Sequence, residues 1–264
     1  MRAAAWPDPG DHDTLVLSQN AWGGAALWPR RRVLLARLLR DLRPAVVGLQ
    51  EVHAPSATGD LGQAGELAAL AGDYNAWFAP GRITSTGACE GVALLCRADV
   101  EVLDHSVESL TLDRNDFLEG PSQRVVLRAA IRRGPAIIDV LVTHLSLSRA
   151  ARLRTARELL AFAARERLRS GSAGAILMGD FNALPTEDCI QCLQADTPDA
   201  GWLDAWSHLH PRAPGATWPA GLPLRRIDYI FAQPKDRWTV VRCDRMPFSG
   251  SDHLGLAAQL RLRA

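Results

Sequence analysis

Short apolar segments alternate with amphipathic segments along most of the chain. Residues 14–19 alternate apolar and polar side chains, which predicts a strand, and residues 29–42 space their leucines by three and four, which predicts a helix. Residues 45–49 form a continuous apolar run that ends at Gln50 and Glu51. Such a run is typical of a buried strand, and its end delivers polar side chains to a site. The chain therefore opens with a predicted strand, helix and strand.

The same interleaving continues to the C-terminus. Beta-branched runs at 91–103 and 124–143 predict paired strands and a hairpin that turns at residues 132–135, and the polar loop 111–122 is placed to overhang a substrate. No linker-like stretch or repeat interrupts the pattern, so we expect one α/β domain over residues 1–264, with one mixed sheet or two. The remaining predicted elements are helices at 61–71 and 149–168 and strands at 74–78, 175–178, 227–231, 238–243 and 254–260.

Composition permits a large core but does not name a substrate. The 264 residues are 47% hydrophobic, and the formal net charge is only +1 with 22% charged residues. The chain therefore has neither a basic field that would indicate nucleic acid nor an acidic tail. Almost every basic residue is arginine, with Lys235 the only lysine, a bias that we attribute to base composition.

Two further features bear on location. Residues 1–10 lack the apolar stretch of a signal peptide, and no later run reaches the roughly 20 apolar residues that span a bilayer. We therefore expect a cytoplasmic protein without integral membrane association, and we expect it to be a monomer. The five cysteines are an odd number and are scattered, which argues against a secreted disulfide framework. Cys189 and Cys192 lack a second ligand pair for zinc, so we expect them on the buried face of a short helix.

Polar motifs stand where the predicted strands end, and neighbouring strand ends build one site in a layered α/β fold. Asn20 ends the first strand, and Asp228 lies inside an apolar strand, where a carboxylate is costly to bury without a partner. The candidates for that partner are His253 or a metal ion. The four motifs are Gln50-Glu51, Thr143-His144, Gly179-Asp180-Phe181-Asn182 and Ser251-Asp252-His253.

Hard oxygen ligands such as Glu51, with Asp252 as an alternative, suit Mg²⁺ or Mn²⁺ better than zinc. We expect the bound ion to be Mg²⁺, with Mn²⁺ as the second candidate. The chain has no G-x-S-x-G nucleophile elbow and no G-x-x-x-x-G-K-[ST] nucleotide loop. These absences favour direct attack of water on a phosphate ester.

Taken in order, these motifs resemble the endonuclease/exonuclease/phosphatase superfamily, which includes pancreatic-type deoxyribonucleases, abasic-site endonucleases, neutral sphingomyelinases and inositol-polyphosphate 5-phosphatases. The resemblance extends from Thr14 to the C-terminus. It implies a four-layered α-β-β-α sandwich with two mixed sheets face to face and a metal site at one edge. The residues that carry it are Gln19-Asn20, Gln50-Glu51, Thr143-His144-Leu145, Gly179-Asp180-Phe181-Asn182, Arg226-Ile227-Asp228-Tyr229-Ile230 and Ser251-Asp252-His253.

The resemblance also implies roles for these side chains. Glu51 resembles the principal metal ligand, with Asn20 beside it and Asp252 as an alternate ligand. Asp180 resembles the group that positions or deprotonates the attacking water. His144 and Asn182 resemble the donors of hydrogen bonds to phosphate oxygens. Asp228 and His253 resemble the pair in which the carboxylate orients the imidazole. The resemblance leaves open whether Asp180 or His253 is the general base.

Departures from the abasic-site branch narrow the choice. Trp22 stands where those endonucleases carry a carboxylate, and His144 replaces their tyrosine, so the pattern is closer to deoxyribonucleases and sphingomyelinases. The first hypothesis is a nuclease-like phosphodiesterase, which cleaves nucleic acid. The second is a phosphodiesterase that cleaves a small phosphodiester. A phosphatase, a sphingomyelin phosphodiesterase and a non-catalytic phospholigand-binding module are the alternatives.

Several single residues have purely structural interpretations. Asp180 and Asn182 can form an Asx turn, and Arg124, which begins a strand, is a further candidate for phosphate contact. Trp22 and Trp218 lie near motifs and are candidates to line the cleft. The other histidines are expected to be solvated; they are His12, His53, His105, His208 and His210.

Overall fold

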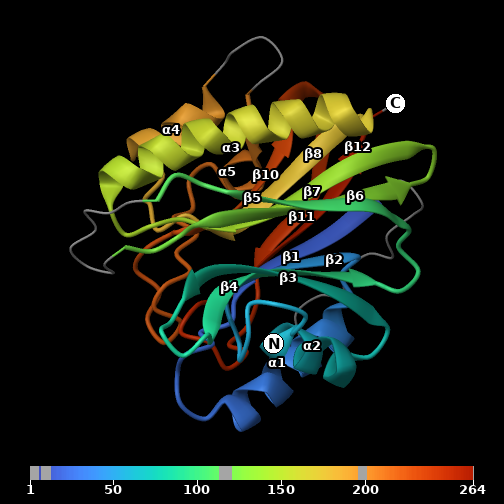
Figure 1. Ribbon diagram of the computed structural model, residues 1–264. Helices are drawn as coiled ribbons and strands as arrows, with labels where there is room; N and C mark the ends of the chain where they lie inside the picture. The colour runs from blue at the N-terminus through green and yellow to red at the C-terminus, as the bar shows by residue number, and fades with distance from the viewer. Residues whose placement is uncertain (1–5, 7–12, 113–120, 196–200, 264) are drawn as a thin grey trace.

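The structure is a computed structural model, and it describes residues 6, 13–112, 121–195 and 201–263. These residues form two six-stranded mixed sheets that pack face to face, with helices on the outer faces (Figure 1). The predicted four-layered α/β sandwich is therefore confirmed. The prediction of one domain over residues 1–264 stays a prediction.

The first sheet has the order β11-β12-β1-β2-β4-β3, and only its central pair β1 and β2 is parallel. Helices α1 (Trp28–Leu42) and α2 (Gly62–Ala71) cover its outer face, where leucines of α1 pack on the strands. The strands are β1 (Asp13–Asn20), β2 (Val46–Ala54), β3 (Tyr74–Ile83), β4 (Cys89–Arg97), β11 (Trp238–Arg245) and β12 (Leu256–Leu262).

The second sheet repeats this plan in the order β5-β6-β7-β8-β10-β9, with β7 and β8 as its parallel pair. Helices α3 (Arg149–Ser170) and α4 (Asp188–Gln194) cover its outer face, and α5 (Ala205–Leu209) follows β9. A 3-10 turn, Lys235–Arg237, precedes β11. The strands are β5 (Val102–Ser109), β6 (Val125–Arg133), β7 (Ala136–His144), β8 (Gly174–Asp180), β9 (Leu203–Asp204) and β10 (Asp228–Gln233).

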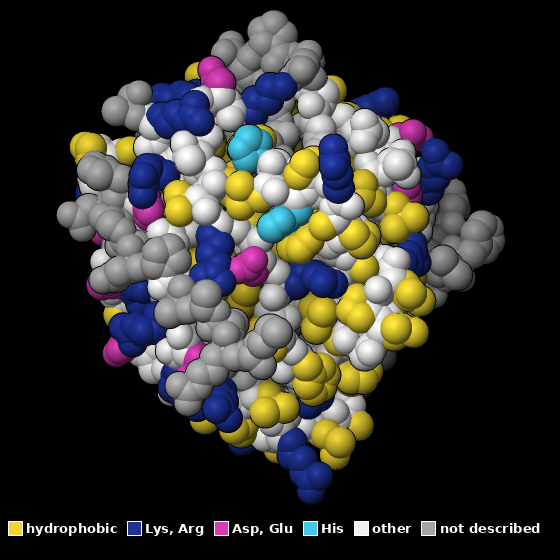
Figure 2. Space-filling model, turned by 180° about the vertical axis from the view of Figure 1, so that it is seen from behind, with side chains coloured by type: hydrophobic (Ala, Val, Ile, Leu, Met, Phe, Trp, Pro, Cys, Tyr) yellow, Lys and Arg dark blue, Asp and Glu magenta, His cyan; other side chains and the backbone are white. Residues whose placement is uncertain are grey.

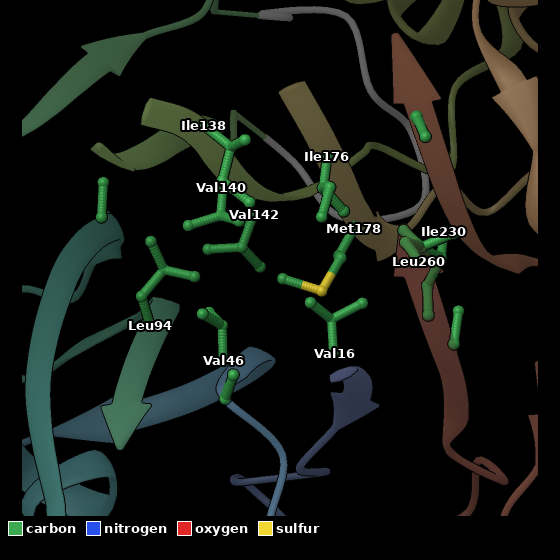
Figure 3. Packing of buried hydrophobic residues seen from close by; sticks show 14 of the residues in the cluster. Val16, Val46, Leu94, Ile138, Val140, Val142, Ile176, Met178, Ile230 and Leu260 are labelled. Atoms are coloured by element: carbon green, nitrogen blue, oxygen red, sulfur yellow. The ribbon is translucent and has the colours of Figure 1, made fainter. Parts of the chain in front are cut away.

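The main core lies between the sheets. Val46 and Leu94 of the first sheet face Val142 and Met178 of the second across this layer (Figure 3). Gly48 permits the close approach, because a Cβ there would lie 3.0 Å from Val142 Cγ2 and 3.2 Å from Met178 Cε. Burial of these apolar side chains fixes the two sheets, and hence their edges, relative to each other.

Most predicted elements are confirmed, including the hairpin of β6 and β7 and the short helix α4, which buries Cys189 but leaves Cys192 only partly buried. The run 91–103 is an exception, since β4 and β5 lie in different sheets and do not pair. Apolar patterning identifies strands but does not reveal the sheet to which each belongs. Of the predicted loop 111–122, residues 113–120 lie outside the described part of the chain.

The strand prediction was also wrong at Glu51. Strand β2 does not end there but continues to Ala54, because a bulge between Leu49 and Val52 absorbs the irregularity in its pairing with β4. Among the described residues, no helix is long and apolar enough to cross a membrane.

Candidate functional site

The site is assembled at the same edge of the two parallel strand pairs, where β1, β7 and β8 end and β2 has its bulge. Asn20 ends β1 and Glu51 follows next to it on β2, while His144 ends β7 directly opposite Asp180 at the end of β8. Asn20 joins the two sheets, because its Nδ2 donates to Glu51 Oε1 at 2.9 Å and to Asp180 Oδ2 at 3.1 Å. Side chains from these four strands therefore meet in one polar centre.

Two further side chains enter from antiparallel neighbours. Asp228 begins β10 and lies opposite Asp180 in the register of β8 and β10. His253 stands in the loop before β12, with Nδ1 2.9 Å from Asp228 Oδ2 and Nε2 3.7 Å from Asp180 Oδ2. Asp228 thus has the imidazole partner that its burial requires. The imidazole also links Asp228 to Asp180.

The backbone at this centre adopts uncommon conformations. Glu51, in the bulge of β2, has φ 53°, and Asn182 has φ 50°. Positive φ is unfavourable for residues other than glycine, and such strain concentrates at functional sites. The Asp180 carboxylate stabilises the backbone conformation of Asn182, because its Oδ1 accepts from the Asn182 backbone N–H at 2.9 Å. This hydrogen bond confirms the expected Asx turn. At Glu51, the carbonyl accepts from Gly23 N at 2.9 Å.

His144 and Asn182 form a neighbouring polar pair. Asn182 Nδ2 lies 3.1 Å from His144 Nε2 and donates to the Leu145 carbonyl at 2.9 Å, and His144 Nε2 is 3.7 Å from Asp180 Oδ2. Burial, aided by the nearby charges of Arg124 and His253, lowers the pKa of His144 well below its usual value. The His144 ring is therefore neutral at pH 7.

Burial and neighbouring charges shift the pKa values of Asp180, Glu51 and His253. Burial raises the pKa of Asp180 to about 7 against the lowering effect of His253, and burial also raises the pKa of Glu51 although the Asn20 hydrogen bond opposes it. Burial alone would lower the pKa of His253, but the Asp228 and Asp180 carboxylates outweigh it and raise that pKa to about 10. His253 is therefore a cation that compensates two of the buried carboxylates.

Asp252 lies beside this centre rather than in it. Its Oδ2 accepts from the Trp218 indole N–H at 3.2 Å, whereas its Oδ1 is buried without a hydrogen-bond partner. Trp218 is half-buried, and Trp22, after Asn20 in the chain, is 40% exposed. Trp22 thus lies in the loop that follows Asn20, and Trp218 lies in the loop before β10 and contacts the loop of Asp252.

The donor set suits a hard divalent cation. Potential ligand atoms of Glu51, His144 and Asp180 lie within 4.8 Å of one another, and so do those of Asp180, Asp228 and His253. Two buried carboxylate oxygens, Asp228 Oδ1 and Asp252 Oδ1, have no hydrogen-bond partner and are therefore free to bind a cation. Oxygen-rich sites of this kind are typical of Mg²⁺ and Mn²⁺. In this structure Asn20 turns its amide nitrogen, not its oxygen, toward the carboxylates, so its role as a ligand stays a prediction.

Several residues that hold the site were not identified from the sequence. Ser251 Oγ donates to the Asn20 carbonyl at 2.7 Å and accepts from His253 N at 3.1 Å, so it joins two loops of the site. Arg31, with a side chain buried at the start of α1, contacts the same loops. The Ser-Asp-His motif was a signal for Ser251, but nothing in the local pattern distinguishes Arg31 from its neighbouring arginines.

The histidines that were expected to be solvated divide into two groups. His105 and His208 are exposed, but His53 lies half-buried in β2 with Nε2 3.0 Å from Glu90 Oε2. His210 is also half-buried, with Nε2 2.8 Å from the Cys243 carbonyl. Both residues are partly exposed, so the expectation of solvated rings holds in part; their protein partners come from strands that are distant in sequence. His12 lies outside the described residues.

Arg124 lies at the start of β6, as predicted, but it is buried. It lines a small pocket together with Arg82, Glu90 and His144. The pocket therefore places two arginines next to the polar centre, and contact of Arg124 with phosphate stays a prediction.

Fold and site together define a hydrolase-like α/β sandwich with a polar, carboxylate-rich edge, and comparison with known proteins identifies the family. The sequence model of the Endonuclease/Exonuclease/phosphatase family matches residues 17–253, and the chain belongs to this family. Its members are hydrolases that act on phosphoester bonds. No curated protein sequence matches the chain.

Solved structures agree with this assignment. The catalytic domain of human Nocturnin with bound sulfate is 20% identical with a TM-score of 0.75, over 95% of this chain and 94% of that one. An endonuclease/exonuclease/phosphatase from Beutenbergia cavernae is 25% identical with a TM-score of 0.76, over 96% and 72%. A mannosyl-6-phosphatase from Bacteroides thetaiotaomicron is 18% identical with a TM-score of 0.68, over 94% and 99%.

Proposed function

We propose that this protein hydrolyses a phosphodiester, with nucleic acid as the first candidate substrate, by direct attack of water in the presence of Mg²⁺ or Mn²⁺. One observation carries the proposal. Asp180 lies within 3.1 Å of the Asn20 amide and within 3.7 Å of both His144 and His253, so groups from both sheets converge on one carboxylate. A small phosphodiester is the second candidate.

Glu51 is the proposed principal ligand of the ion, with Asn20 and Asp252 at its side. A bound divalent cation would offset negative charge on a phosphate oxygen, which otherwise repels the attacking water. Carboxylate ligands and a raised pKa of Glu51 support this role, because the charge that burial disfavours is the charge that a cation stabilises.

His144 and Asn182 are the proposed donors to phosphate oxygens. They lie 3.1 Å apart on adjacent strand ends, and Asn182 is held by the Asx turn of Asp180. Their proximity to the attacking centre would place the phosphorus close to Asp180, and fixed donors stabilise the charge that grows during the reaction. The similar Nocturnin structure holds a bound sulfate, an oxyanion of the same shape as phosphate.

Asp180 and His253 are both placed to act in proton transfer during the attack of water, and His253, as a cation, has to lose its own proton before it can accept another. The gap of 3.7 Å between Asp180 Oδ2 and His253 Nε2 is too long for a direct hydrogen bond, and one water can contact both atoms. Asp228 orients the imidazole through its hydrogen bond of 2.9 Å to Nδ1. We therefore assign proton transfer to the pair without dividing it between them.

A substrate panel tests the proposal. Purified protein is incubated with bis-p-nitrophenyl phosphate, plasmid DNA, single-stranded RNA and sphingomyelin in Mg²⁺ or Mn²⁺, with EDTA and His253→Ala as controls. We expect metal-dependent cleavage of a nucleic acid that both controls abolish, and weaker binding at high salt. Cleavage of bis-p-nitrophenyl phosphate alone would favour the small phosphodiester, and no cleavage of any substrate would contradict the proposal. The expected monomeric state is measured in the same preparation.

A further inference from the structure

Each of the two sheets contains the same strand-helix-strand unit, and each unit has an arginine at the same place. In the first unit β1 and β2 are parallel and joined through α1, and in the second β7 and β8 are parallel and joined through α3. Arg31 is the fourth residue of α1, and Arg152 is the fourth residue of α3. Both side chains are buried, at 7% and 6% exposure.

Arg31 donates all five of its guanidinium N–H groups to backbone carbonyls. Four of the carbonyls belong to the loop that follows Asn20, and the fifth is that of Gly250, next to Ser251. The guanidinium also lies 5.2 Å from the centre of the Trp22 ring. Arg31 thus binds the loop after Asn20 to the loop that carries Asp252 and His253. The four carbonyls of the first loop are those of Ala21, Trp22, Ala25 and Ala26, at 2.8 to 3.0 Å.

Arg152 makes the corresponding contacts in the second unit. Its Nη1 donates to the carbonyls of Ser146 at 3.2 Å and Leu147 at 2.6 Å, in the loop that follows His144. Its Nη2 pairs with Glu187 Oε2 at 2.5 Å. The other Glu187 oxygen accepts from Leu184 N at 2.9 Å, two residues after Asn182. Arg152 therefore binds the loop after His144 to the loop after Asn182.

We infer that Arg31 and Arg152 are paired positioning residues, Arg31 for the metal-binding side of the site and Arg152 for the phosphate-binding side. The division follows from what each side chain holds: Arg31 fixes the loops of Asn20 and Asp252, and Arg152 fixes the loops of His144 and Asn182. The inference rests on the proposed function of the site. Neither arginine touches the reacting atoms.

Charge alone does not explain these contacts. Burial lowers the pKa of the Arg31 guanidinium, and the negative charges of Glu51 and Asp252 oppose that shift, so its charge does complement the carboxylate side. A lysine would keep the charge, but its three donors on a flexible chain cannot reach five fixed carbonyls. The planar fork is therefore the property that position 31 requires, whereas Arg152, whose Nε has no hydrogen-bond partner, uses its two terminal nitrogens to hold two loops at once.

The test compares Arg31→Lys with Arg152→Lys, each serving as the control for the other. Mn²⁺ affinity of EDTA-treated protein is measured by titration calorimetry, and the Kd for inorganic phosphate and the KM for bis-p-nitrophenyl phosphate are measured at saturating Mn²⁺. We expect Arg31→Lys to weaken Mn²⁺ binding about 10- to 100-fold, with KM nearly unchanged. We expect Arg152→Lys to raise the phosphate Kd and KM about tenfold, with Mn²⁺ affinity nearly unchanged.

Two further variants test the same contacts from the opposite side if a lysine variant does not fold. Gly250→Ala would place a Cβ 3.2 Å from Arg31 Cα at φ 89°, and Glu187→Gln removes the charge that pairs with Arg152. Variants that change both affinities equally, or neither, would overturn the inference while wild-type turnover leaves the proposed function intact. Wild-type protein that neither binds Mn²⁺ nor cleaves a phosphodiester would overturn both.

Discussion

In the pair of Asp228 and His253, a single imidazole ring both orients toward Asp228 and compensates the charge of the buried carboxylates. The imidazole is held by one hydrogen bond of 2.9 Å and compensates carboxylates on both sides. Removal of the ring leaves Asp228 and Asp180 buried without that compensation, and removes one candidate for proton transfer. Both losses slow the attack of water on the phosphate ester.

At this scale we predict that His253→Ala lowers kcat by about 100-fold or more, the range that a general acid or base contributes. His208→Ala is the matched control, because His208 is exposed in α5 and lies outside the site. Steady-state kinetics on bis-p-nitrophenyl phosphate with saturating Mn²⁺ checks the prediction. Equal kcat values for His253→Ala and wild type would remove His253 from the mechanism.

Residue identities were the most predictable part of the site. Asn20, His144 and Asp180 end predicted strands, Glu51 ends the apolar run 45–49, and the final Ser-Asp-His precedes the last predicted strand; the structure brings these side chains together. The carbonyl partners of Arg31 were not predictable, because a local pattern of apolar and charged residues contains no information on which distant loop returns to the helix. Tertiary topology supplies that information.

The bulge in β2 is the element that aims Glu51 at the site. Its position was not predictable, because the irregularity arises in the pairing of β2 with β4 and not in the sequence of either strand alone. The loop after β1 stabilises the bulge through the hydrogen bond from Gly23 N to the Glu51 carbonyl. A Cβ at Gly23 would lie 2.1 Å from that carbonyl oxygen.

We therefore predict that Gly23→Ala displaces Glu51 and weakens Mn²⁺ binding by about tenfold or more. Gly221→Ala is the control, because a Cβ there meets nothing within 4 Å. Titration calorimetry with EDTA-treated proteins measures both affinities. Wild-type affinity in Gly23→Ala would show that the loop does not determine the position of Glu51.

At the scale of the whole molecule, the outer layer of the second sheet contains a buried charge network. Arg128 of β6 is fully buried, and its guanidinium pairs with Asp139 at 2.5 Å, Asp104 at 3.0 Å and Glu166 at 3.5 Å. This network joins β5, β6 and β7 to α3. Elsewhere charges are dispersed, and arginines are scattered over the face shown in Figure 2 rather than gathered in one field.

Loss of the central cation would leave the buried Asp139 carboxylate without a cationic partner, with only the hydroxyls of Ser170 and Ser172 as donors. We predict that Arg128→Ala lowers the free energy of unfolding by about 3–5 kcal/mol. Arg37→Ala, which removes an exposed pair with Asp41 at 3.5 Å, should cost less than about 1 kcal/mol. Urea unfolding followed by circular dichroism measures both changes, and equal losses would show that burial does not strengthen the network.

The same network predicts a pH dependence. Burial alone would raise the pKa of Glu166, but hydrogen bonds and charges of Arg169 and Arg128 outweigh it and lower that pKa below 4.5. A lowered folded-state pKa contributes stability above the unfolded-state pKa, and this stability is lost as pH falls through the folded-state value. The stability difference between wild type and Glu166→Gln should therefore be large at pH 7 and shrink below about pH 4.5. A difference that grows on acidification would contradict this account.

The central claim is that Glu51 holds a divalent ion that the hydrolysis requires. The most direct measurement is the initial rate of phosphodiester hydrolysis as a function of Mn²⁺ or Mg²⁺ concentration, in EDTA-treated wild type and in Glu51→Gln. The account predicts no turnover without added metal, saturable recovery in the wild type, and a shift of that recovery to at least about tenfold higher metal concentration in Glu51→Gln. Turnover that persists in EDTA, or an identical metal dependence in the two proteins, would contradict it.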